Sequence, residues 1–166
     1  MKSPSLFLIA ILILSLSTAF AQDETAATEA KMQFSSVMMG TNNSFTSLKG
    51  AKIKDDENFV YYESEYGLGT KALTILNSKT DTTEWYCYVR FHMIDDMKDV
   101  VAVESGVFGL LNMIIGGGKI KGTEGTEGKL TRTDLYVTEN NAWLGELVSD
   151  GDKQIFHIFM KNTKWK

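Results

Sequence analysis

Apolar side chains recur at intervals of three and four residues in two parts of the chain, which is the spacing of a helix with one buried face. The small and acidic residues 22–30 pass into the first stretch, which has its first apolar position at Ala27 and ends at Gly40. Its apolar positions are Ala27, Ala30, Phe34, Val37 and Met38. A second short helical turn, capped by Asn42 or Asn43, is expected to stop at residues 49–50.

The second helical stretch begins after Asp95 or Asp96, either of which can cap it, and ends at the glycines 116–118. Its apolar positions are Met97, Val100, Val101, Val107, Phe108, Leu111 and Ile115. Gly106 is expected to bend it. A membrane span is not expected, because the apolar run 100–115 is shorter than the roughly 20 residues that a span needs and contains Glu104.

Six other runs have the alternation and the β-branched or aromatic content of strands, and turn-forming residues bound them. They are residues 59–66, 71–77, 84–91, 129–138, 142–148 and 154–160. Asn140 with Asn141, and Asp150 with Gly151, are hairpin signals. Residues 122–128, rich in Gly, Thr and Glu, are expected to form a loop.

The order helix, three strands, helix, three strands predicts an α+β fold, because neither helix joins two strands as a parallel crossover would. We expect one antiparallel sheet of about six strands with both helical segments on one face. The order also indicates a tandem duplication with halves 27–92 and 93–166, since residues 52–54 align with 119–121 and residues 86–91 with 155–160. A single irregular α+β domain with the same order is the alternative.

The first 21 residues have the composition of a signal peptide. Lys2 is basic, residues 6–16 are an apolar core rich in Leu and Ile, and Ala19 and Ala21 form a cleavage site of small residues. An N-terminal membrane anchor would need a longer apolar run. No Cys near the site offers an acceptor for a lipid. We therefore predict an exported protein, periplasmic or secreted, in which residues 22–166 form a single domain without a membrane span.

The charge balance and the single cysteine limit the partners and reactions that fit the chain. The chain has 17 Lys and Arg against 21 Asp and Glu and no basic block, which argues against nucleic acid as a partner. The single cysteine cannot close an internal disulfide. Alternation places Cys87 on the same face as Trp85, Val89 and Phe91, so we expect a buried structural thiol and not a nucleophile.

One short run of the sequence and the order of the predicted elements each resemble known proteins. The run Phe45-Thr46-Ser47-Leu48-Lys49-Gly50, followed by a Tyr-rich strand and a Gly turn, resembles small exported bacterial proteins whose function is uncharacterised. The doubled order of helix and strands resembles the architecture of β-lactamase inhibitor proteins. That second resemblance implies protein binding through the exposed face of the sheet, and it carries no individual residues over.

Alternation also predicts which side chains lie on that exposed face. In the run 85–91 the inward side chains are expected to be Trp85, Cys87, Val89 and Phe91. In the last run they are expected to be Phe156, Ile158 and Met160. The residues that alternate with these then point away from the helices. Thr74 and either Tyr61 or Tyr62 join them if the register allows. The predicted binding residues are Tyr61, Tyr86, Tyr88, Arg90, Tyr136, His157 and Phe159. Such a composition is typical of a recognition surface. The alternative is aromatic pairing across strands, or cover of this face by the N-terminal residues 22–30.

No catalytic motif is apparent. His92 and His157 lie at the ends of different strands, and no Gly-x-Ser-x-Gly elbow occurs. The glycines 122 and 128 lie six positions apart, where a phosphate loop has five, and Leu130 follows Lys129 where Ser or Thr belongs. The expected function is therefore non-catalytic binding of an envelope or extracellular protein, or of a small apolar or glycan-like ligand, without a cofactor.

Two alternatives stay open. A copper(I) carrier could use His92 and Met93 with Met97, or His157 with Met160, because imidazole and thioether ligands suit that ion in an exported protein. Methionines at helical spacing are also common core residues. The other alternative is an enzyme whose functional residues are scattered along the chain.

Overall fold

The computed structural model describes residues 24–165, so the predicted signal peptide lies outside the described residues. A helix and a short 3-10 turn are followed by four strands, and a second helix is followed by four more. The elements are α2 (Glu24–Gly40), η1 (Thr41–Asn43), β1 (Lys49–Asp55), β2 (Phe59–Leu68), β3 (Lys71–Ser78), β4 (Trp85–His92), α3 (Met97–Gly116), β5 (Ile120–Glu127), β6 (Leu130–Val137), β7 (Trp143–Asp150) and β8 (Ile155–Lys161).

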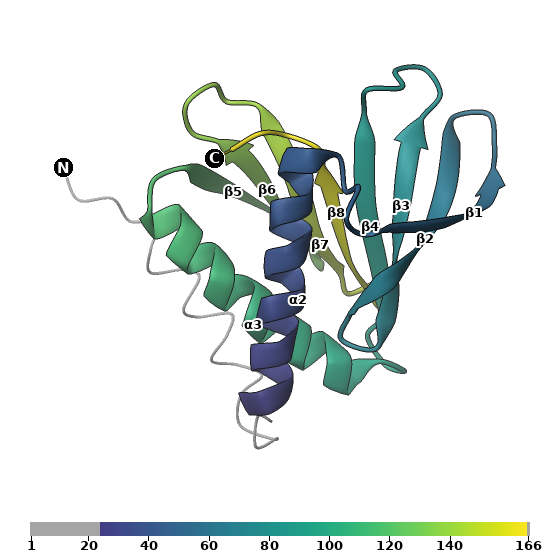
Figure 1. Ribbon diagram of the computed structural model, residues 1–166. Helices are drawn as coiled ribbons and strands as arrows, with labels where there is room; N and C mark the ends of the chain where they lie inside the picture. Colours follow the sequence, from purple (N-terminus) through teal and green to yellow (C-terminus); the bar gives the residue numbers. More distant parts are fainter. Residues whose placement is uncertain (1–23, 166) are drawn as a thin grey trace.

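All eight strands form one antiparallel sheet in the order β1-β2-β3-β4-β8-β7-β6-β5. Each half contributes four consecutive strands, and β4 and β8 pair at the centre. Both helices lie on the same side of the sheet (Figure 1). The α+β prediction is confirmed, but the predicted number of about six strands is too low.

The two strands that the sequence did not predict are the two edges of the sheet, β1 and β5. Residues 49–50 begin β1, where a helical turn was expected to end, and residues 122–127 belong to β5, where a loop was expected. Most of their side chains are exposed on both faces. Because neither face is buried, the sequence has no alternation of apolar and polar residues at these positions.

The predicted second helical turn is limited to η1, Thr41–Asn43. Ser44 and Phe45 then adopt left-handed backbone conformations, with φ of 57° and 56°, which end the helix. Phe45 is nevertheless fully buried, and its N–H donates to the carbonyl oxygen of Gly40 at 2.8 Å.

Helix α3 runs without interruption through Gly106, and the predicted bend at this residue stays a prediction. Gly106 lies against α2, where a Cβ on it would meet backbone atoms of Ala27 and Lys31. Asp96 precedes the helix as expected, but its side chain does not cap it. That carboxylate accepts the His92 N–H at 2.9 Å and pairs with Lys71 at 2.8 Å.

The core lies between the helices and the inner face of the sheet. Cys87, Val89 and Phe91 of β4 are buried there, as are Phe156, Ile158 and Met160 of β8, so the predicted alternation of both strands is confirmed. Side chains of both helices pack on this face, among them Phe34, Val37, Val103 and Val107.

Among residues 24–165, α3 is the one helix long and apolar enough to cross a membrane by length and composition alone. The observed helix has 20 residues and begins before residue 100, so its length does not exclude a span as the shorter predicted run did. One side of α3 is packed in the core, where Val103, Val107 and Leu111 are buried.

The corresponding strands of the two halves begin at nearly constant separations. The starts are Lys49 and Ile120, 71 residues apart; Phe59 and Leu130, 71 apart; Lys71 and Trp143, 72 apart; and Trp85 and Ile155, 70 apart. The predicted alignment of residues 52–54 with 119–121 is therefore displaced by four residues from these strand starts. The repeated order of elements is observed, and the duplication itself stays a prediction.

Candidate functional site on the open face of the sheet

The face of the sheet opposite the helices carries the outward residues of the central strand pair. In β4 these include Tyr86, Tyr88 and Arg90, and in β8 they include His157 and Phe159. The register places Tyr88 opposite Phe159 and Arg90 opposite His157. No helix of the described part of the chain covers this face (Figure 1).

Aromatic rings from four strands meet on this face, and we call them the outer aromatic cluster. Its members are Phe59, Tyr61, Tyr86, Tyr88, Trp143 and Phe159. Phe159 is central: its ring lies 5.0 Å from that of Tyr86, 6.0 Å from Trp143 and 6.2 Å from Tyr88. Such separations fall within the favourable range for aromatic pairs, so the rings stabilise one another and hold their positions.

A shallow hollow of roughly 340 Å³ opens beside this cluster. Its lining residues are Tyr61, Leu76, Tyr88, Glu146, His157 and Phe159. Leu76 is 7% exposed and forms an apolar part of the wall. Most of the lining is aromatic or aliphatic, and the ionisable groups Glu146 and His157 come from the adjacent strands β7 and β8.

An ion-pair network fixes the polar side of the hollow. Arg132 lies 2.6 Å from Glu146 and 3.1 Å from Asp134, and the Trp143 indole N–H donates to Asp134 at 3.0 Å. His157 Nε2 lies 3.7 Å from Glu146. Burial lowers the pKa of His157 from its usual value of 6.5, and Glu146 opposes this effect only in part. The imidazole is therefore neutral at pH 7.

The three tyrosines of the outer aromatic cluster differ in what their hydroxyl groups bind. Tyr61 donates to Asp56 at 2.6 Å, and Tyr86 donates to Glu84 at 2.7 Å. Tyr88 donates to no carboxylate among residues 24–165. Burial raises the pKa of Tyr88, and the neighbouring Arg90 opposes this rise only in part. Arg90 is exposed and forms no ion pair within that same range. Arg90 interacts with the Tyr88 hydroxyl, and both side chains remain at least partly exposed on this face.

Six of the seven predicted binding residues line the hollow or adjoin its lining, and the seventh, Tyr136, lies farther out on the same sheet. Tyr61, Tyr88, His157 and Phe159 line the hollow, while Tyr86 stacks on Phe159 and Arg90 adjoins Tyr88. Tyr136 lies on β6 opposite Trp143 of the outer aromatic cluster, and it does not line the hollow. Between the two tyrosines left open by the sequence, Tyr61 is on the outer face, and Tyr62 packs against the core beside Trp85 at 5.7 Å.

Three residues of this face were not predicted from the sequence: Leu76 and Glu146, which line the hollow, and Trp143, which contacts Phe159. Leu76 directly follows the inward Ile75, and both are buried. Two consecutive apolar residues in a strand were the signal in the sequence that both faces of β3 are covered at this point. For Glu146 we find no signal in the sequence, since its place depends on how β7 pairs with β8.

Metal ligands do not gather in the described part of the chain. No group of three His, Cys, Asp or Glu side chains suited to a metal ion occurs among residues 24–165. His157 points to the outer face and Met160 to the core, so the sheet separates the members of this suggested copper pair. Cys87 is buried, and burial raises the pKa of its thiol, in line with a structural role.

No family model matches the chain, and no curated protein or solved structure matches it at the significance required. The resemblances stated above stay predictions.

Proposed function

We propose that this is an exported, non-catalytic binding protein that holds a ring-shaped apolar group of a partner protein or small ligand in the hollow of its open sheet face. The hollow carries the proposal: an apolar wall with a few converging polar groups is the usual composition of a binding site. Its volume, roughly 340 Å³, is near the lower limit of ligand pockets, about 300 Å³, and so suits one ring better than a large molecule.

The arrangement of the walls supports a flat ligand. Tyr88 and Phe159 present aromatic surface from neighbouring strands, and their rings are held by further contacts with His157 and Tyr86. A bound ring could stack on these surfaces without rearranging them, so little conformational entropy would be lost on binding. The Tyr88 hydroxyl and the neutral imidazole of His157 supply hydrogen bonds at the rim.

Fragment binding tests the proposal. The ¹⁵N-labelled full chain would be titrated with 4-methylphenol, the side-chain analogue of tyrosine, and separately with methyl β-glucoside as a sugar ring. We expect saturable shifts confined to the lining residues for at least one probe, and an affinity at least tenfold lower in Tyr88→Ala. Tyr66→Ala is the matched control, because Tyr66 is exposed and lies outside the outer aromatic cluster.

Shifts scattered over the surface, no saturable shift for either probe, or equal affinity of the Tyr88→Ala and Tyr66→Ala variants would reject the hollow as the binding site. A Phe159→Leu variant, which keeps an apolar side chain of similar size, would also be measured in case Tyr88→Ala does not fold.

The proposal that the protein is exported rests on the N-terminal sequence alone. This sequence has the basic Lys2, the apolar residues 6–16 and the small residues Ala19 and Ala21. N-terminal sequencing of the protein recovered from outside the cytoplasm should begin at Gln22. Recovery of the intact chain from the cytoplasm would contradict this part of the proposal.

A further inference from the structure

The two edges of the sheet differ in how they are protected from pairing with another strand. β1 has register shifts against β2 between residues 49 and 52 and between 52 and 54, and it carries Lys49, Lys52 and Lys54. Irregular pairing and lysines are the usual means of blocking an edge. β5 pairs with β6 at every position from Ile120 to Glu127 without a shift. It is the edge of the sheet whose pairing is regular.

The backbone of β5 has groups that face away from the sheet. The Thr138 N–H donates to the Lys119 carbonyl oxygen at 2.9 Å, which makes this a hydrogen-bonded pair of the β5–β6 ladder. Hydrogen-bonded pairs recur at every second residue of an antiparallel ladder. Residues 121, 123, 125 and 127 therefore bond to β6, and the N–H and C=O groups of Gly122, Glu124 and Thr126 point outward. No other described strand pairs with them.

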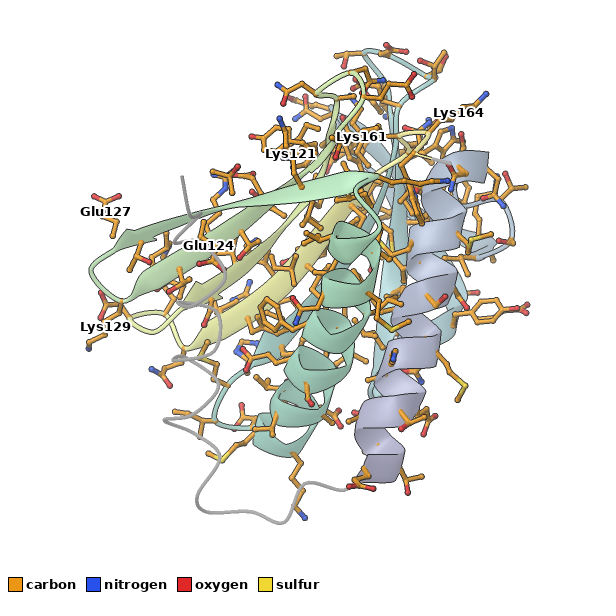
Figure 2. The ribbon with its side chains drawn as sticks, turned by 90° about the vertical axis from the view of Figure 1, so that its left-hand side faces the viewer. Lys121, Glu124, Glu127, Lys129, Lys161 and Lys164 are labelled. Carbon is orange, nitrogen blue, oxygen red and sulfur yellow. The ribbon has the colours of Figure 1, made fainter. Side chains whose placement is uncertain are left out.

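Charge is divided along this edge. Lys119 and Lys121 stand at its beginning, and Glu124 and Glu127 stand towards its end. Figure 2 shows Lys121 and Glu127 on one side of β5 and Glu124 on the other. The side chains from Lys121 to Glu127 are all exposed. An antiparallel copy of the same strand would place its acidic end beside the basic beginning, so the edge is complementary to itself.

We propose that two copies of this chain associate by antiparallel pairing of β5 with β5, which continues the sheet from one copy into the other. In the register with Thr123 opposite its counterpart, Gly122 faces Glu124 and the outward backbone groups meet as hydrogen-bonded pairs. Lys119 then faces Glu127 on the same side of the sheet, and no like charges are opposed. The second copy is the occupant that this charge pattern favours.

The pairing has a geometric consequence for the hollow. Antiparallel strands of one continuous sheet are related by an axis perpendicular to the sheet, so the outer faces of both copies lie on the same side. Two hollows would then be presented in one direction, which allows bivalent attachment to a partner that repeats its ring-shaped group. The association itself does not depend on the hollow, and the two proposals can fail separately.

Sedimentation equilibrium of the full chain, over about 5 to 500 µM, tests the association, since an edge interface of this small size predicts a weak, concentration-dependent dimer. Glu124→Pro removes an outward N–H without removing a bond to β6, because proline is tolerated on an edge whose N–H faces solvent. We expect at least a tenfold loss of dimer affinity with unchanged unfolding temperature. Glu124→Gln is the control and should still dimerise.

A charge exchange tests the orientation even if Glu124→Pro fails to fold. The double variants Lys119→Glu with Lys121→Glu, and Glu124→Lys with Glu127→Lys, should each be monomeric alone and associate when mixed. A wild-type chain that stays monomeric at the highest concentration overturns the proposal. Undiminished dimers of folded Glu124→Pro, self-association of either double variant, or a mixture that stays monomeric would also overturn it.

Discussion

Gly106 of α3 lies against the backbone of α2, where a Cβ on it would be 2.5 Å from the carbonyl oxygen of Ala27. The same Cβ would lie 2.7 Å from the amide nitrogen of Lys31. Since both are backbone atoms, they can give way only if one helix moves away from the other. The crossing of the two helices therefore requires glycine at this position.

Gly106→Ala should destabilise the protein by about 1–3 kcal/mol, the usual cost of overpacking a closely packed contact. Gly109→Ala is the matched control on the same helix, because a Cβ there would meet nothing within 4 Å. That control should stabilise the protein by roughly 0.5–1 kcal/mol, since alanine favours helix. Urea unfolding of both variants measures the difference, and equal effects of the same sign would contradict the close crossing.

Trp165 attaches the C-terminal segment to the end of α2. Its indole N–H donates to the Met38 carbonyl oxygen at 3.0 Å and to the Thr41 hydroxyl at 2.8 Å. Trp165→Phe keeps an aromatic ring but removes these bonds, so the free energy of unfolding should fall by about 1–2 kcal/mol. Lys164→Ala, at an exposed neighbour, should change it by less than about 0.5 kcal/mol. Similar losses in both would contradict this role of the indole.

The Tyr86 phenol should ionise well above the usual tyrosine pKa value of 10. Burial, and then its bond to Glu84, raise the pKa of Tyr86 from 10 to about 12. Because the folded state holds this proton more tightly than the unfolded state, the stabilisation is complete below pH 10 and is lost as the pH rises from 10 to 12. Glu84→Gln should lower the pKa of Tyr86, because it removes the charged acceptor.

Ultraviolet difference titration of the tyrosines measures these values, and Tyr86→Phe identifies the phenol concerned. Ionisation of Tyr86 near pH 10 would contradict the burial of its hydroxyl.

The thiol of Cys87 should report on opening of the core. It is 2% exposed on the inner face of β4, and burial raises its pKa, so both access and thiolate content are low. A maleimide should react with it only as fast as the sheet and helices separate, and the rate should rise with urea in step with unfolding. Rapid labelling in native buffer would contradict this, and Cys87→Ala provides the unreactive control.

Strands with one buried face were predictable from the sequence, and strands exposed on both faces were not. The predicted runs for β2, β3, β4, β6, β7 and β8 begin within one residue of the observed strands. β1 and β5 are mostly charged residues, glycine and threonine, because the edge of the sheet buries almost nothing there. Their pairing with β2 and β6 comes from backbone hydrogen bonds, which leave no pattern in the side chains.

The residues of the candidate site were predictable only as far as alternation reaches. Alternation placed Tyr86, Tyr88 and Arg90 on one face, and did the same for His157 and Phe159. It carries no information on which strands are neighbours, so Tyr136 was grouped with them although β7 separates its strand from β8. Glu146 was missed for the same reason, because it meets His157 only through the pairing of β7 with β8.

The strand order bears on how the chain folds. Of the strand pairs described, all but β4 with β8 join strands that are consecutive in the chain. Two consecutive antiparallel strands form a hairpin, which closes a short loop and forms within microseconds. The remaining pair joins residues such as Val89 and Ile158, which are 69 positions apart, and so has the larger entropic cost of loop closure. We expect two locally formed meanders to precede one slow docking event, in which the central pair and the helix crossing at Gly106 form together.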